Sequence, residues 1–145
     1  MLAYRYIGSY ILKCDDMITD YIEVPNNKWG IVVVRDFDVF DEKEELLAIM
    51  RSFDIPRHSA NRALSILSNY NTGMAISLPY LKMSAIFISD YTSPSEFYST
   101  AIHELVHVSD AILDYYGETW DGEPSAYLVG YLTKELVEIV GKPCI

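Results

Sequence analysis

Residues 93–116 read Ser-Pro-Ser-Glu-Phe-Tyr-Ser-Thr-Ala-Ile-His-Glu-Leu-Val-His-Val-Ser-Asp-Ala-Ile-Leu-Asp-Tyr-Tyr, and the interpretation of the chain starts from them. Ser93 and Glu96 match a capping box, and a proline stands at the first helical position. A helix should therefore begin at Pro94 and continue to the last tyrosine of the stretch. Gly117 is expected to stop it.

The middle of this helix carries the pattern His-Glu-x-x-His at residues 103–107. A spacing of four residues places both imidazoles on one face of a helix, one turn apart, where both can reach a single ion. Glu104 lies next to that face, where it can take a proton from a metal-bound water. The chain has only three histidines, and the remaining one is His58. The pattern predicts a zinc hydrolase, and in particular a peptidase.

The histidines lie on the polar side of the expected helix. This face is formed by Thr100, His103, His107, Asp110 and Asp114. The other side is apolar and is formed by Phe97, Ala101, Leu105, Val108 and Ile112. Asp110 and Asp114 either orient the ligand imidazoles or are ordinary surface acids.

A catalytic zinc ion usually takes three protein ligands and leaves one position for water, so a third ligand is needed. Glu123 is preferred because it opens the last expected helix. The loop of residues 117–122 is short enough to fold that helix back antiparallel to the histidine helix. Ala126 and Gly130 are small and recur at helical spacing, which predicts a close approach of the two helices.

Two other acids in the same loop, Glu118 and Asp121, are the rival ligands. If Glu123 is not a ligand, it is a first-turn acid stabilised by the helix dipole. Trp120 either packs over the site or belongs to the core. The metal-ligating role of Glu123 and its alternatives therefore stay open at this point.

The pattern His103-Glu104-x-x-His107 followed by Glu123-x-x-Ala126 resembles the gluzincin group of zincin metallopeptidases, in which the third zinc ligand is a glutamate on the next helix. The short gap is similar to that of small zincin-like proteins of phages and prophages. The resemblance covers roughly a third of the chain, from about Ile86 to Leu132. No histidine stands at the third-ligand position of the metzincin branch.

This resemblance implies an α+β zincin-like fold, in which a mixed β-sheet packs on the long motif helix and on the following glutamate helix. It also implies bound Zn²⁺ and a peptide or protein substrate. An edge strand should line the cleft, and Met83 to Ser89 is the expected edge strand. A peptide would add alongside it by strand pairing.

The mechanism implied is metal-assisted hydrolysis. Zinc would be held by His103, His107 and Glu123. The metal lowers the pKa of its bound water towards about 7, and Glu104 takes the proton and later delivers it to the leaving amine. Tyr127 and Tyr131 follow Glu123 at helical spacing, and Tyr127 is the expected donor to the oxyanion. Because the chain has 12 tyrosines, coincidental placement is easy.

The 145 residues are expected to form one domain. Its expected parts are a β-rich segment at 1–40, helices at 41–70, strands at 73–89, the histidine helix at 94–116 and a last helix at 123–140. Ile18–Val24 and Gly30–Arg35 should form a hairpin. The continuous apolar run Ile31–Val34 predicts a strand covered on both faces. Asp41 should cap the first helix, and the second should run from Arg57 to Tyr70.

The net charge of −10 argues against nucleic-acid binding. The sequence shows neither a membrane span nor a secretory signal, so a cytoplasmic protein without a membrane partner is expected. Cys14 and Cys144 are read as reduced thiols, with a disulfide as the alternative. The oligomeric state is not predicted.

A second function remains open beside the peptidase. The chain could keep the zincin fold without catalysis and serve as a structural or interaction protein, for instance in a phage or prophage. Glu104 favours catalysis, because a structural zinc site fills all four positions and needs no base.

Overall fold

The computed structural model describes residues 4–7, 10–13, 17–118 and 122–141. Cys14, Cys144, Trp120 and Asp121 lie outside the described residues, and with them the question of a disulfide. The elements are β1 (Tyr4–Ile7), β2 (Tyr10–Lys13), β3 (Ile18–Val24), β4 (Trp29–Arg35), α1 (Lys43–Ser52), α2 (Arg57–Leu67), β5 (Gly73–Leu78), η1 (Pro79–Leu81), β6 (Met83–Ile88), α3 (Pro94–Tyr115) and α4 (Glu123–Val140). The described part of the chain is therefore of the α+β class that the sequence predicts.

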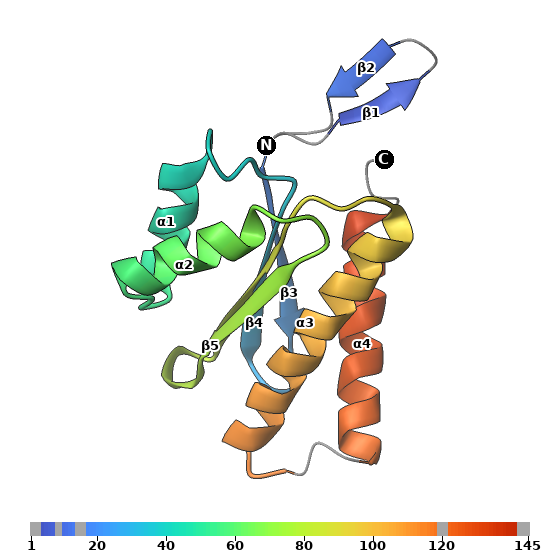
Figure 1. Cartoon of the computed structure of the whole chain (residues 1–145). Coiled ribbons are helices and arrows are strands. Elements are labelled where there is room, and N and C mark those ends of the chain that lie inside the picture. Colours follow the sequence, from blue (N-terminus) through green and yellow to red (C-terminus); the bar gives the residue numbers. More distant parts are fainter. Residues whose placement is uncertain (1–3, 8–9, 14–16, 119–121, 142–145) are drawn as a thin grey trace.

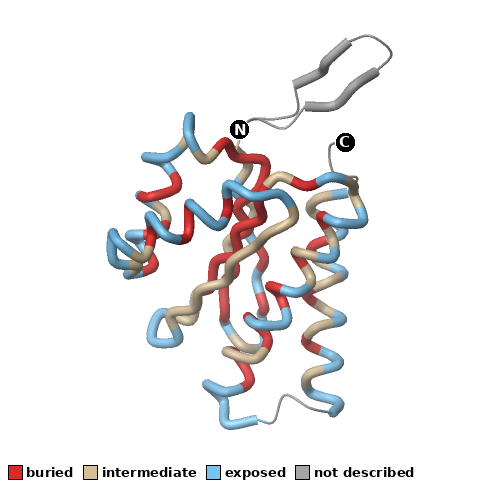
Figure 2. Tube along the Cα trace, in the orientation of Figure 1, coloured by how far each residue is buried: buried red, intermediate tan, exposed pale blue. Residues whose placement is uncertain are grey.

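The larger sheet has the strand order β3-β4-β6-β5. The pair β4–β6 is parallel and the outer pairs are antiparallel, so the sheet is mixed as expected. Helices α1 and α2 cover one face, and α3 and α4 cover the other (Figure 1). Each face has its own hydrophobic cluster. Burial is concentrated in the central strands and on the inner sides of the helices (Figure 2).

The β3–β4 hairpin is confirmed, and residues 25–28 form its turn. In β4, Ile31 and Val33 pack towards α3 and α4, whereas Val34 packs towards α1 and α2. The prediction that the run Ile31–Val34 is covered on both faces is therefore confirmed. Because successive side chains of a strand point to opposite faces, β4 contributes residues to the hydrophobic clusters on both faces of the sheet.

The edge-strand prediction for Met83–Ser89 is wrong. β6 lies inside the sheet between β4 and β5, and β5 is the edge strand on the side of α3. All residues of β6 after Met83 are buried, whereas every residue of β5 is partly exposed. A continuous apolar strand requires cover on both faces and on both edges, which only an interior position supplies.

Helix α3 begins at Pro94, as predicted, and Ser93 caps it. The backbone N–H of Glu96 donates to Ser93 Oγ at 3.1 Å. The reciprocal half of the capping box, from the Ser93 N–H to the Glu96 carboxylate, is not among the hydrogen bonds of the described residues. The Glu96 side chain is therefore free of the cap and points elsewhere.

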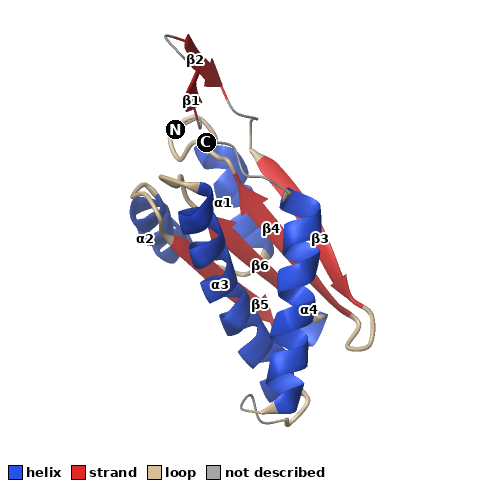
Figure 3. Cartoon of the chain, turned by 90° about the vertical axis from the view of Figure 1, so that its right-hand side faces the viewer, coloured by secondary structure: helices blue, strands red, loops and turns tan. Residues whose placement is uncertain are grey.

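Helix α4 lies beside α3 over the same face of the sheet (Figure 3). Its buried side chains are Leu128, Leu132 and Leu136. Gly130 is exposed, and a Cβ added there would meet no atom within 4 Å. The expected approach of the two helices through Ala126 and Gly130 is thus wrong. The leucine stripe sets the rotation of α4, because it is the larger apolar surface to bury.

Two helix boundaries differ from expectation. Helix α1 starts at Lys43, and its start is organised by Asp38, whose carboxylate accepts from the backbone N–H of Phe40 and Asp41 at 2.8 and 3.1 Å. Helix α2 ends at Leu67 rather than Tyr70. No helix in the described part of the chain is both long and apolar enough to cross a membrane.

Candidate functional site

His103 and His107 meet on the outward face of α3. Their Nε2 atoms lie 3.2 Å apart, and their rings meet edge to face. Both residues are exposed, whereas Leu105 and Val108 on the opposite side of the helix are fully buried. The four-residue spacing therefore brings the imidazoles to one point, as the sequence predicts.

This distance can be compared with the separation expected for two ligands of one metal ion. Zinc binds imidazole nitrogen at about 2.0–2.1 Å, so two nitrogens on neighbouring corners of a tetrahedron lie about 3.3 Å apart. The observed Nε2–Nε2 separation of 3.2 Å matches that value. The same distance also fits an N–H···N hydrogen bond between neutral rings. The two histidines fit as two of the ligands.

Glu104 turns from the histidine face towards β5 and is only 7% exposed. Within the described part of the chain, no hydrogen bond or ion pair reaches its carboxylate. Burial raises the pKa of the Glu104 carboxyl, although positive charge on His103 and His107 acts against this rise. A buried carboxyl without a partner costs stability, which makes it a candidate for chemistry.

Gly73, the first residue of β5, makes room for Glu104. A Cβ at this position would lie 2.9 Å from Glu104 Cγ and 2.8 Å from Thr100 Cγ2. Only glycine lets the strand and the helix come this close. From the sequence, Gly73 is expected to help stop the second helix and to begin a strand. A glycine in a strand is also a signal of close backbone approach.

A polar cavity of about 350 Å³ adjoins this contact. It is lined by Asn71, Gly73, Glu96, Ser99, Thr100, His103 and Glu104. Sequence reasoning placed Glu96 at the cap and did not assign it to the site. Glu96 stands four and seven residues before Thr100 and His103, so helical spacing is the sequence signal that could have placed it on their face of the helix.

Glu123 lies in the first turn of α4 and is exposed. The spacing of Glu123 from Leu128 and Leu132 along the helix places it on the face of α4 opposite to these buried leucines. Among the described residues, no three His, Cys, Asp or Glu side chains come together in a group that could hold a metal. The structure therefore brings the two histidines together but does not bring Glu123 to them.

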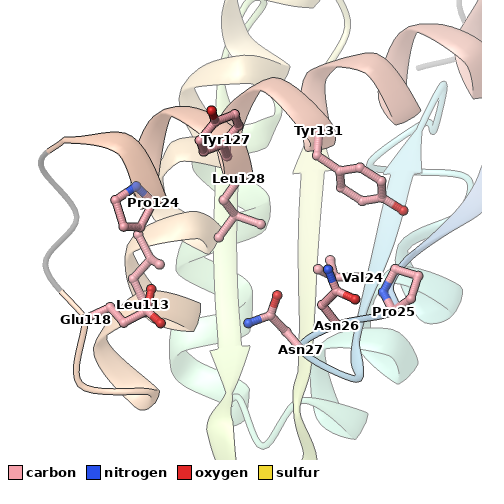
Figure 4. Close-up of a pocket in the computed structure, with 10 residues that line it drawn as sticks. All are labelled: Val24, Pro25, Asn26, Asn27, Leu113, Glu118, Pro124, Tyr127, Leu128 and Tyr131. Atoms are coloured by element: carbon pink, nitrogen blue, oxygen red, sulfur yellow. The ribbon is translucent and has the colours of Figure 1, made fainter.

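Tyr127 lines a different cavity, of about 370 Å³, between the β3–β4 turn and the facing ends of α3 and α4 (Figure 4). Tyr127 is 75% exposed there. Glu118 lines the same cavity, and neither histidine of the pair does. Tyr131 also lines this cavity, and its hydroxyl donates to the carbonyl of Glu23 at 2.8 Å. The expected oxyanion donor is thus not in the cavity beside His103.

The acids that follow the pair on α3 make no contact of the expected kind. Asp110 is partly buried and its Oδ1 lacks a hydrogen-bond partner in the described part of the chain, whereas Asp114 is exposed. In the described part of the chain, neither aspartate forms a hydrogen bond with the imidazole of His103 or His107. His58 is exposed and contacts its neighbour Ser59 at 3.3 Å.

Comparison with known proteins does not assign this chain to a family. No protein-family model matches this chain. No curated protein and no solved structure matches it either. The function is therefore argued from the site itself.

Proposed function

We propose that this chain is a metal-dependent hydrolase, specifically a zinc peptidase, in which His103 and His107 bind the ion and Glu104 is the general base. The observation that carries the proposal is the 3.2 Å separation of the two Nε2 atoms, which suits a single tetrahedral ion. The buried carboxylate of Glu104, one residue from the first ligand, supports it. This combination is what the zincin resemblance implies.

An ion at this position would polarise a carbonyl and lower the pKa of bound water towards about 7. Glu104 accepts the proton of the nucleophilic water and returns it to the leaving amine. The raised pKa of its carboxyl moves it closer to neutral pH, where a group serves best in both roles. The free edge of β5 beside α3 is the proposed place for an extended peptide, which would add by strand pairing.

Glu123 is proposed as the third protein ligand on the strength of the sequence alone. It opens the last helix, after the histidine helix, in the order that the gluzincin resemblance implies. Its role is separable from that of the histidines, because it lies on another helix. Metal binding by the histidine pair and metal binding by Glu123 should therefore be tested with separate variants.

The first experiment measures zinc. The purified full chain is dialysed against zinc and analysed by elemental analysis and titration calorimetry, with His103→Ala and His107→Ala as test variants. Both variants should lose stoichiometric zinc, and His58→Ala is the matched control that should keep it. Glu123→Gln weakens zinc affinity if this residue is a ligand and leaves it unchanged otherwise. Retention of full zinc by both histidine variants overturns the metal proposal.

The second experiment separates binding from chemistry. Glu104→Gln should keep the metal, because the variant removes a proton acceptor and not a ligand. It should abolish cleavage of an unstructured protein substrate such as casein. If cleavage by Glu104→Gln equals that of the parent chain, Glu104 is not the base.

A zincin-fold interaction protein without catalysis is the second candidate. The observation in its favour is that no three-ligand group is found within the described residues. A chain of this kind would keep the fold, with or without the metal. It would show no cleavage of casein above the level of the Glu104→Gln variant.

A further inference from the structure

The polar cavity next to His103 contains two carboxylates from one helix. Glu96 lies in the first turn of α3, and Glu104 follows two turns later. The other side chains that line it are neutral hydroxyls and an amide, apart from His103 itself. Within the part of the chain that the structure describes, no lysine or arginine lines the cavity. The cavity is therefore anionic, in a chain whose net charge is −10.

Both carboxylates are free to interact with a ligand. Glu96 is exposed and does not form the reciprocal capping bond. Glu104 is more than nine-tenths buried, lines the cavity, and has no partner among the described residues. Neither oxygen of the Glu104 carboxylate is among the buried, unpartnered atoms of the described residues, so the carboxylate is open to the cavity, where a group from outside can satisfy it.

We propose that this cavity receives the cationic side chain of an arginine or lysine residue of a peptide substrate, with Glu96 as the specificity-determining residue. The inference rests on the proposed function, because only a peptidase would use this cavity as a subsite beside the bond that it cleaves. The volume of about 350 Å³ lies within the range of about 300–1,000 Å³ typical of ligand sites. A planar guanidinium suits the carboxylate of Glu96 and the neighbouring hydroxyls and amide, because all five of its N–H groups are donors, and Glu104 stays available as the base.

The position of the cavity relative to the histidines sets where the basic residue must lie. His103 belongs both to the cavity wall and to the proposed metal pair. His107 does not line the cavity. The basic side chain therefore lies on the N-terminal side of the histidine pair along α3.

The test compares two probes that differ only in charge. Nα-acetyl-arginine N-methylamide and its neutral isostere Nα-acetyl-citrulline N-methylamide are titrated into metal-free, isotope-labelled full chain, and amide shifts are followed by NMR. The arginine probe should bind about twofold to fivefold more tightly, as expected for a partly exposed charge pair. The shifts should centre on Asn71, Gly73, Ser99 and Thr100. Equal affinities for the two probes, or shifts centred elsewhere, overturn the proposal.

Glu96→Gln supplies the residue-level test, with Glu44→Gln as control, because Glu44 is also an exposed first-turn acid, on α1. The ratio of the two affinities should fall towards one in Glu96→Gln and stay at the parent value in Glu44→Gln. An unchanged ratio in Glu96→Gln removes Glu96 from the site. The comparison of probes on the parent chain does not depend on any variant folding.

The outcome is independent of the metal proposal, because the titration is done without zinc. If zinc binding fails while the arginine preference holds, the cavity is a site for basic peptides in a protein that is not a zinc hydrolase. If zinc binding and cleavage hold while the preference fails, the enzyme stands and this specificity is wrong.

Discussion

Gly73 and Glu104 are packed so closely that a single added methyl group at residue 73 would lie 2.9 Å from the Cγ of Glu104. This contact joins the edge strand β5 to the helix that carries the histidines. It holds the proposed base against backbone, so the position of Glu104 depends on a residue far from it in sequence.

Replacement of Gly73 by alanine should lower the free energy of unfolding by about 1–3 kcal/mol, the usual range for overpacking. Thr100 and Glu104 would have to move, because the new Cβ overlaps both. Urea denaturation measures the change. Gly130→Ala is the matched control, since its Cβ would enter open space in a helix, and it should stabilise the chain by about 0.5–1 kcal/mol. Equal effects of the two variants would contradict the contact.

Ser93 should contribute about 1 kcal/mol to stability as the cap of α3. Its Oγ accepts the backbone N–H of Glu96 at 3.1 Å. We expect Ser93→Ala to lose this contribution in thermal or chemical unfolding. Ser93→Asp keeps an acceptor at the cap and should remain near the parent stability. A loss of the same size in both variants would mean that the cap is not the cause.

Arg35 is buried at the end of β4 between two carboxylates. Its guanidinium donates to Asp20 at 3.0 Å and to Asp36 at 2.9 Å. The hydroxyl of Tyr91 also donates to Asp36. Arg35→Met should destabilise the fold by about 3–5 kcal/mol, because it leaves buried negative charge without this cation. Arg62→Met, on the exposed side of α2, should change stability by no more than about 0.5 kcal/mol.

Asp90 should make stability depend on pH. Burial, with repulsion from Asp38 and Asp36, raises the pKa of its carboxyl from 3.8 to about 6. The folded state thus holds the proton more tightly than the unfolded state. The contribution of this group is favourable below about pH 4 and is lost as the pH rises through about 6.

Asp90→Asn removes this dependence. At about pH 8 the variant should be more stable than the parent chain by on the order of 1 kcal/mol, a value reduced for partial exposure to water. Near pH 4 the two should be equal. Unfolding measured across this range checks the sign, with the exposed Asp41→Asn as control. A variant that is less stable at high pH would refute the assignment.

Local patterns predicted much of the fold. The cap at Ser93, the start of α3 at Pro94 and the bounds of α4 depend on a few neighbouring residues, and these were confirmed. The meeting of His103 and His107 was also confirmed, because a spacing of four determines it once the helix forms. Their binding of a metal remains a prediction.

The errors concern long-range choices. Met83–Ser89 was expected at the sheet edge, yet its apolar run belongs inside, and β5 takes the edge instead. Ala126 and Gly130 were expected between two helices, yet the leucines of α4 occupy the buried side. In both cases the sequence also contains the signal for the observed arrangement. The apolar run of β6 favours an interior strand, and the leucine stripe of α4 favours burial of its own face.

Local sequence patterns predict most of the helices and strands of this protein and the meeting of two imidazoles on one helix face, because these features depend mainly on neighbouring residues. Tertiary structure alone decided which strand lies beside α3, which face of α4 carries Glu123, and which glycine accommodates Glu104. Those outcomes follow from how whole helices rotate and strands order themselves to bury the largest apolar surface, a balance summed over contacts distant in sequence.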